Sequence, residues 1–99
     1  MANYILTNKA VEDLSKIWDY TFEVWSEAQA DKYYYMLIHS FQELADGIVA
    51  GKNYVEVRND VFGFRSGQHI IFYRKLKDNR IEIARILHGR MDLKSRIQE

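Results

Sequence analysis

The chain has 99 residues, of which 47% are hydrophobic and 28% charged, with no cysteine and a formal net charge of zero. This composition predicts one soluble domain, residues 1–99, built around a single core. It excludes disulfides and thiolate chemistry, and no apolar run approaches the ~20 residues that span a bilayer, so we expect a cytoplasmic protein that binds no membrane.

The zero net charge hides an asymmetry along the chain. Residues 1–50 carry three lysines against eight acids, and residues 51–99 carry four lysines and seven arginines against six acids, so the halves have net charges of −5 and +5. We therefore expect an acidic helical half and a basic sheet half. The arginines suit recognition of carboxylate or phosphate. The alternative is a solvated sheet face with arginines at the strand ends.

The first 25 residues predict a short strand followed by a helix. Asn3–Thr7 is β-prone, and Thr7 or Asn8 then offers an N-cap. Beyond it, one face repeats every three or four residues over four turns, which is the spacing of an amphipathic helix. The positions of this face are Val11, Leu14, Ile17, Trp18, Thr21, Phe22 and Trp25.

A second helix is predicted to start at Ser26, because Ser26 and Gln29 have the spacing of a capping box. Gly47 or Gly51 can end it. Since the connection between the two helices is so short, they must form an antiparallel helical hairpin. The apolar stripe of the second helix consists of Ala30, Tyr34, Leu37, Phe41, Leu44, Ala45 and Ile48.

The second half of the chain predicts strands. Two runs, 69–74 and 81–88, are expected to form the central hairpin of a sheet, with Asp78 and Asn79 in a turn that tolerates positive φ. Val61–Arg65 is expected to be an edge strand. The fold class is thus α+β, with an N-terminal strand and an antiparallel two-helix hairpin packed on a three- to four-stranded antiparallel sheet.

Three details of the strand half complete this prediction. Gly63 is a candidate for a β-bulge in the edge strand. Tyr54–Val57 is either a short strand or irregular chain. Leu93–Ile97 has helical spacing but is too short to form a stable helix alone, so we expect it to dock on the sheet or fray.

The helical hairpin can cover only one face of the sheet. The more apolar set on the two central strands is expected under the helices, and the other set is expected to be covered by the C-terminal tail or by another protein. The first set is Ile70, Phe72, Leu76, Ile81, Ile83 and Leu87, facing Trp18, Leu37 and Phe41. The second set is Ile71, Tyr73 and Ile86, flanked by His69 and His88.

Four blocks of the sequence carry a family resemblance. They are Leu14–Tyr20, Gln29–Ala30 followed by Tyr33, Phe64–Gly67 running into His69–Arg74, and Ile81–Asp92. Together they resemble the ParE toxins of the ParE/RelE superfamily, from bacterial type II toxin–antitoxin systems. The last block, which ends in Ile-Leu-His-Gly-Arg-Met-Asp, is the most specific. The chain departs from the family at residues 46–60, where ParE chains usually carry a proline.

The resemblance implies a ParD-type antitoxin that folds onto the toxin and DNA gyrase as the target, with no cofactor and no direct contact with nucleic acid. We expect the antitoxin to lie on the open sheet face, and the target to contact the C-terminal region. The antitoxin residues are Ile71, Tyr73, Ile86, Arg74 and Arg85. The target residues are His88, Arg90, Met91, Asp92 and Arg96.

The alternative is a RelE-type ribosome-dependent mRNA endoribonuclease. Such chemistry needs a base, an acid and cationic donors for the phosphorane, for which Arg65, His69, His88 and Arg90 are the candidates. Compared with RelE-like chains, only Arg90 occupies the position of a catalytic residue. We therefore expect no catalytic site and a toxin that acts by binding. The three histidines do not have the spacing of metal ligands, so no metal site is expected.

Overall fold

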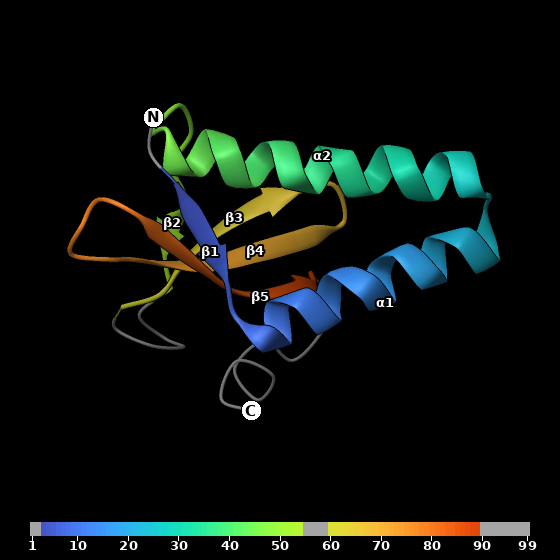
Figure 1. Ribbon diagram of the computed structural model, residues 1–99, viewed down its shortest axis with the longest axis horizontal. Helices are drawn as coiled ribbons and strands as arrows, with labels where there is room; N and C mark the ends of the chain where they lie inside the picture. Colours follow the sequence, from blue (N-terminus) through green and yellow to red (C-terminus); the bar gives the residue numbers. More distant parts are fainter. Residues whose placement is uncertain (1–2, 55–59, 90–99) are drawn as a thin grey trace.

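The structure, a computed structural model, describes residues 3–54 and 60–89. Two long helices lie over one sheet and extend past its end to the loop that joins them (Figure 1). Neither helix in this part of the chain has the length and hydropathy to cross a membrane. In chain order the elements are β1 (Tyr4–Leu6), α1 (Asn8–Val24), α2 (Glu27–Ala45), β2 (Lys52–Asn53), β3 (Phe62–Ser66), β4 (His69–Lys75) and β5 (Ile81–His88).

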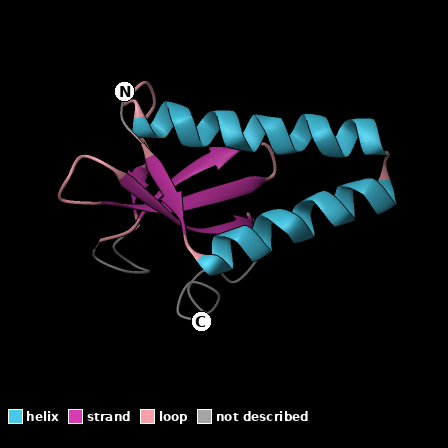
Figure 2. Ribbon diagram, in the orientation of Figure 1, coloured by secondary structure: helices cyan, strands magenta, loops and turns pink. Residues whose placement is uncertain are grey.

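The strands form one sheet of five in the order β1-β5-β4-β3-β2 (Figure 2). The strands β2 to β5 are antiparallel neighbours, which is the predicted antiparallel sheet. β1 adds a parallel edge, because Tyr4 lies opposite Ile81 and Leu6 opposite Ile83. The predicted α+β fold with its N-terminal strand is confirmed, and the sheet is mixed because β1 runs parallel to its neighbour β5.

Both helices begin where their capping residues predict. The Thr7 hydroxyl accepts a hydrogen bond from the Ala10 amide at 3.1 Å, and the Ser26 hydroxyl accepts one from the Gln29 amide at 3.1 Å. These contacts satisfy amide groups that have no partner inside the helix. Gly47 follows the end of α2 with a φ of 75°, as helix-terminating glycines commonly do. The capping residues therefore set the ends of the hairpin.

The helices cover one face of the sheet. Several of the strand residues on this face are ones that we expected on the opposite face. Leu37 and Phe41 of α2 pack in a core that contains Ile71, Tyr73 and Ile86, all buried. The prediction that these three residues lie on an open face is therefore wrong. Ile81 and Ile83 belong to the same core, as predicted.

A β-bulge explains part of this difference. Phe72 lies opposite Arg85, while its neighbour Tyr73 lies opposite Ile83, so Ala84 is an extra residue in β5. Because side chains alternate along a strand, one extra residue moves every later side chain to the opposite face. Ile86 therefore joins Ile83 under the helices, although their positions in the sequence differ by an odd number.

The rear face of the sheet is also buried. Val61, Ile70, Phe72 and Leu87 form a second apolar cluster, and the Tyr54 ring lies 5.2 Å from the Phe72 ring. Ile70, Phe72 and Leu87 were expected under the helices, so this assignment is wrong as well. The described sheet thus has an apolar cluster on each face, and the centre of neither face is open.

Two further predictions about the strands are wrong. β3 is not an edge strand, because β2 pairs with its outer side. Gly63 does not form a bulge, since it lies opposite Phe72 in regular register. A Cβ atom at Gly63 would lie 2.6 Å from the Tyr54 ring, so glycine is required there by packing. The expected strand or irregular segment at 54–57 and the expected helical tail at 93–97 fall mostly outside the described residues.

Candidate functional site

The end of the helical hairpin that extends beyond the sheet carries most of the exposed apolar side chains. We call residues 18–35 the hairpin tip. Eight large hydrophobic side chains are exposed in the described part of the chain, and five of them belong to the tip: Tyr20, Phe22, Val24, Trp25 and Tyr35. Trp25 is 72% exposed. A concentration of exposed large apolar side chains in one segment is a candidate site of interaction with another molecule.

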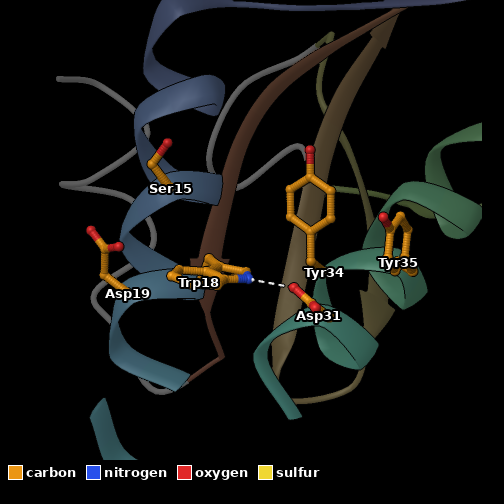
Figure 3. Close-up of a pocket in the computed structure, with 6 residues that line it drawn as sticks. All are labelled: Ser15, Trp18, Asp19, Asp31, Tyr34 and Tyr35. Atoms are coloured by element: carbon orange, nitrogen blue, oxygen red, sulfur yellow. Dashed lines mark hydrogen bonds between the residues drawn. The ribbon is translucent and has the colours of Figure 1, made fainter. Parts of the chain in front are cut away.

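A cleft of about 320 Å³ lies between the two helices at the tip. Trp18 points from α1 toward α2, where its indole N–H donates a hydrogen bond to Asp31 at 3.1 Å (Figure 3). Tyr34 lies beside Trp18 in the same view. The residues that line the cleft are Ser15, Trp18, Asp19, Asp31, Tyr34 and Tyr35. The cleft thus combines aromatic walls with two carboxylates.

The charge around the tip is acidic. Residues 18–35 contain four acids, Asp19, Glu23, Glu27 and Asp31, against the single basic residue Lys32, so their formal net charge is −3. All four acids are exposed. A surface with this sign attracts cationic groups and repels phosphate.

A second cluster of polar side chains joins Tyr33, in the N-terminal half of α2, to the β3–β4 turn. The Tyr33 hydroxyl lies 2.6 Å from Nδ1 of His69 and accepts a hydrogen bond from the Gln68 amide at 2.9 Å. His88, which lies opposite His69 in the sheet, places its ring centroid 5.4 Å from that of His69. Gly67 has a φ of 61°, and a Cβ atom there would lie 2.7 Å from the Tyr33 hydroxyl.

The protonation of this cluster follows from its burial. Burial, and to a lesser extent the nearby His88, lower the pKa of His69 from 6.5 to about 4. At neutral pH His69 is therefore uncharged. Burial also raises the pKa of Tyr33, so its hydroxyl keeps its proton. Since the Tyr33 oxygen accepts from Gln68, its proton is free to be donated to Nδ1 of His69. This arrangement joins α2 to the β3–β4 turn.

Two of the predicted binding arginines are engaged within the fold. Arg85 donates from Nε and Nη2 to the Asp13 carboxylate at 2.8 and 3.1 Å, and the Ile86 amide donates to the same carboxylate at 3.0 Å. The Arg85 and Asp13 side chains are only 12% and 11% exposed. Arg74 forms an ion pair with Glu82 and lies 3.5 Å from Asp60. The hydrogen bond to Glu82 raises the pKa of Arg74.

Within 3–54 and 60–89, no three His, Asp or Glu side chains gather closely enough to hold a metal ion.

Arg65 is exposed on β3, and its Nη1 would lie 3.1 Å from a Cβ atom at Gly89. Tyr33, His69, His88 and Arg65 are thus the titratable side chains that the structure brings together near one end of the sheet.

Comparison with known proteins identifies the family. Residues 4–93 match the model of the ParE toxin of type II toxin–antitoxin systems, parDE. Toxin ParE1 of Mycobacterium tuberculosis is 33% identical over 92 residues, which is 93% of this chain and 94% of the relative. The chain belongs to the ParE toxin family.

Two other ParE relatives match over nearly their whole length. Toxin ParE1 of Caulobacter vibrioides is 31% identical over 98% of this chain and 99% of its own. Toxin ParE of Escherichia coli is 32% identical over 100% of this chain and 96% of its own. A solved structure described as the chromosomal ParDE TA system from P. aeruginosa has the same fold, with a TM-score of 0.74, 24% identity, and coverage of 89% of this chain and 96% of that one.

Within this ParE fold, the residues expected to contact an antitoxin lie in two settings. Ile71, Tyr73 and Ile86 are buried beneath the helices, and Arg74 and Arg85 hold acidic side chains of the chain itself. The open sheet face on which that prediction depended is therefore absent from the described sheet. Of the expected target contacts, His88 lies half-buried at the end of β5. Arg90, Met91, Asp92 and Arg96 fall outside the described residues.

The exposed surface of the hairpin tip was missed by the sequence analysis, which assigned Trp18, Phe22 and Trp25 to a buried stripe. The sequence signal that could have indicated this surface was a surplus of apolar residues in the first helix. Tyr20 and Val24 are one helical turn apart and lie off the predicted stripe. A helix that is apolar on more than one face covers more than one surface. Here the second surface is the exposed side of the hairpin.

Proposed function

We propose that this ParE-family chain is the toxin of a type II toxin–antitoxin pair, that a ParD-type antitoxin neutralises it, and that it acts by binding DNA gyrase. The observation that carries the proposal is the family match over residues 4–93, together with relatives named as ParE toxins that align over nearly their full length. The ParDE system with the same fold supports an antitoxin as partner. Gyrase acts in the cytoplasm, which is the expected location.

The side chains of the described fold favour action by binding over cleavage of RNA. General acid–base catalysis works best with groups that exchange protons near the working pH. His69 has a pKa of about 4 and its Nδ1 lies 2.6 Å from the Tyr33 hydroxyl. Arg74 and Arg85 are held by carboxylates of the chain. Tyr33, His69, Arg74 and Arg85 thus make contacts that hold segments of the fold together.

A supercoiling assay with purified gyrase tests the proposed target. Addition of the chain to gyrase, relaxed plasmid and ATP is expected to reduce supercoiling or to trap cleaved DNA, and an equimolar ParD-type antitoxin is expected to restore activity. A matched assay with purified ribosomes and mRNA is expected to show no cleavage. Codon-specific cleavage that disappears in Arg90→Ala would favour the RelE-type nuclease and contradict the proposal.

The proposed target contacts are the C-terminal positions His88, Arg90, Met91, Asp92 and Arg96. The double variant Arg90→Ala/Arg96→Ala removes two charged side chains from this set. We expect it to inhibit gyrase at least about tenfold more weakly than the wild type, because arginines are frequent hot spots of interfaces. Lys9→Ala, which removes a charge at the start of α1, is the control and is expected to inhibit as the wild type does.

A further inference from the structure

The cleft between α1 and α2 has an aromatic wall that is fixed in place. Phe22 stacks on one face of the Trp18 indole, with ring centroids 5.3 Å apart and an interplanar angle of 17°. The indole N–H is held at the same time by its hydrogen bond to Asp31 at 3.1 Å (Figure 3). Because Phe22 covers one face of the indole, only the opposite face can be turned to a ligand. Trp18 therefore has a defined orientation before anything binds.

A second aromatic wall of the cleft comes from α2. The Tyr34 and Tyr35 rings meet edge to face, with centroids 5.6 Å apart and an interplanar angle of 83°. Tyr34 is half-buried and packs against the core beneath the helices, whereas Tyr35 is 67% exposed. A ligand that enters between Trp18 and Tyr34 thus meets side chains that need little rearrangement. Such preorganisation lowers the entropy that binding costs.

Two carboxylates border the aromatic walls, Asp19 from α1 and Asp31 from α2. Asp31 accepts the Trp18 indole N–H with its Oδ1 atom, so its Oδ2 atom can accept a hydrogen bond from a ligand. Within residues 3–54 and 60–89, the Asp19 carboxylate makes no hydrogen bond or ion pair with another side chain. The surrounding hairpin tip has a net charge of −3, which adds to the attraction for cations.

The volume and the lining of the cleft indicate the chemical class of its ligand. A volume of about 320 Å³ lies at the small end of ligand pockets, so the cleft suits a small molecule rather than a large cofactor. Aromatic faces attract ammonium groups, and carboxylates accept charge-assisted hydrogen bonds from them. Since each helix supplies one carboxylate, a molecule with an ammonium group at both ends and an aliphatic chain between them matches the lining.

We propose that the cleft binds a small aliphatic diamine. One ammonium group lies over the free face of the Trp18 indole and donates to Asp31, the aliphatic chain lies against Tyr34, and the second ammonium group donates to Asp19. The inference goes beyond the proposed function and does not depend on it, because a chain that fails to inhibit gyrase can still bind the diamine. A metal ion would use the carboxylates alone, whereas the diamine uses the aromatic walls as well.

Isothermal titration calorimetry of the full chain with 1,4-diaminobutane tests the proposal. The expected dissociation constant is about 1 mM or lower, which is reasonable for a ligand with so few atoms. The uncharged 1,4-butanediol and magnesium chloride at equal ionic strength are expected to show no saturable binding. Trp25→Phe leaves Trp18 as the only tryptophan of the chain, so its indole N–H signal in a ¹H–¹⁵N spectrum is expected to shift and saturate with the same constant.

Two pairs of acid variants separate the cleft from the general charge of the tip. Asp19→Asn/Asp31→Asn keeps an acceptor for the Trp18 indole and is expected to bind the diamine at least about tenfold more weakly. The matched control Glu23→Gln/Glu27→Gln removes two exposed acids of the tip that do not line the cleft, and it is expected to bind within about twofold of the wild type. Equal losses in the two pairs would show attraction to an acidic surface and overturn the proposal.

Aromatic variants test the walls of the cleft. Trp18→Leu is expected to weaken binding at least about fivefold. Tyr35→Leu changes an exposed ring, so it tests the cleft even if Trp18→Leu does not fold, and it is expected to weaken binding at least about twofold. Unchanged affinity in the folded variants, equal binding of 1,4-butanediol, or the absence of saturable binding to the wild type would each overturn the proposal.

Discussion

The hairpin tip and the sheet half of this ParE-family protein use the same kinds of side chain in opposite ways. In the sheet, aromatic residues such as Phe72 are buried, and arginines such as Arg85 contact acids of the chain itself. In the tip, aromatic residues such as Trp25 are exposed among exposed acids. In the basic half, Arg74 and Arg85 are paired with acids of the chain itself and are not free to bind an acidic partner. The acidic half carries the exposed apolar surface.

The largest expected difference in stability between the two regions comes from truncating one aromatic side chain in each of them. Phe72→Ala is expected to lower the free energy of unfolding by about 4 kcal/mol, because it leaves a cavity in the fully buried rear cluster. Trp25→Ala is expected to change it by less than about 0.5 kcal/mol, because the side chain is mostly exposed. Urea denaturation followed by circular dichroism measures both. Equal losses would contradict the division into a buried and an exposed region.

Removal of one carboxylate from each region sharpens the comparison of charges. Asp13→Ala leaves the buried Arg85 guanidinium and the Ile86 amide without their acceptor, so the expected loss of unfolding free energy is about 3 kcal/mol. Asp19→Ala removes an exposed acid of the tip and is expected to cost less than about 0.5 kcal/mol. Thermal and urea unfolding measure both variants. A wild-type stability for Asp13→Ala would show that this pair is solvated.

Mild acid is expected to weaken the sheet end. The pKa of His69 is about 4 in the fold and 6.5 as the ordinary value, so between these values the unfolded chain binds a proton that the folded chain does not. Stability is therefore complete above pH 6.5 and falls as the pH drops toward 4. At about 1.4 kcal/mol per pH unit, the loss between neutral pH and about pH 5 is at most about 2 kcal/mol.

Urea denaturation in buffers between neutral pH and about pH 5 measures this loss. His69→Asn is the matched variant, because its side-chain oxygen can accept from Tyr33 without titrating. His88 and Asp13 are the titratable neighbours of His69 and stay in place in this variant. In His69→Asn, the free energy of unfolding is expected to depend less on pH in this range. An unchanged slope would assign the effect to other groups.

The smallest expected effect concerns the hydroxyl groups of two tyrosines of α2, Tyr33, which contacts the β3–β4 turn, and Tyr35, which is exposed. Tyr33→Phe removes the hydroxyl that accepts from the Gln68 amide and lies 2.6 Å from Nδ1 of His69, so we expect a loss of about 1 kcal/mol. Tyr35→Phe changes an exposed ring of the tip, and its stability is expected to match the wild type. Differential scanning calorimetry of the two variants makes the comparison, and identical melting temperatures would rule out the contribution of the Tyr33 hydroxyl.

Much of the fold could be predicted because its signals are local. Thr7 and Ser26 cap their own helices, and Asn79 takes the positive φ that its turn requires. The face of each central strand could not be predicted in the same way. The bulge at Ala84 reverses the alternation of side chains between the two sheet faces halfway along β5, and no feature of the strand's own sequence predicts it. Ile86 was placed on the wrong face for this reason, whereas for Ile71 and Tyr73 the wrong face of β4 was chosen.

The sequence by itself determined the helical hairpin, the central strands and the ParE family, because caps, turns and periodic apolar residues act between near neighbours. Only the tertiary structure determined which side chains are exposed at the surface. Asp13 and Arg85 are 72 residues apart in the chain, yet their contact removes two charges from the surface. Trp25 has the spacing of a buried residue, yet it is exposed because the hairpin extends past the sheet (Figure 1). Whether a side chain is exposed depends on contacts between segments that are distant in the chain, and these contacts cannot be derived from composition and spacing.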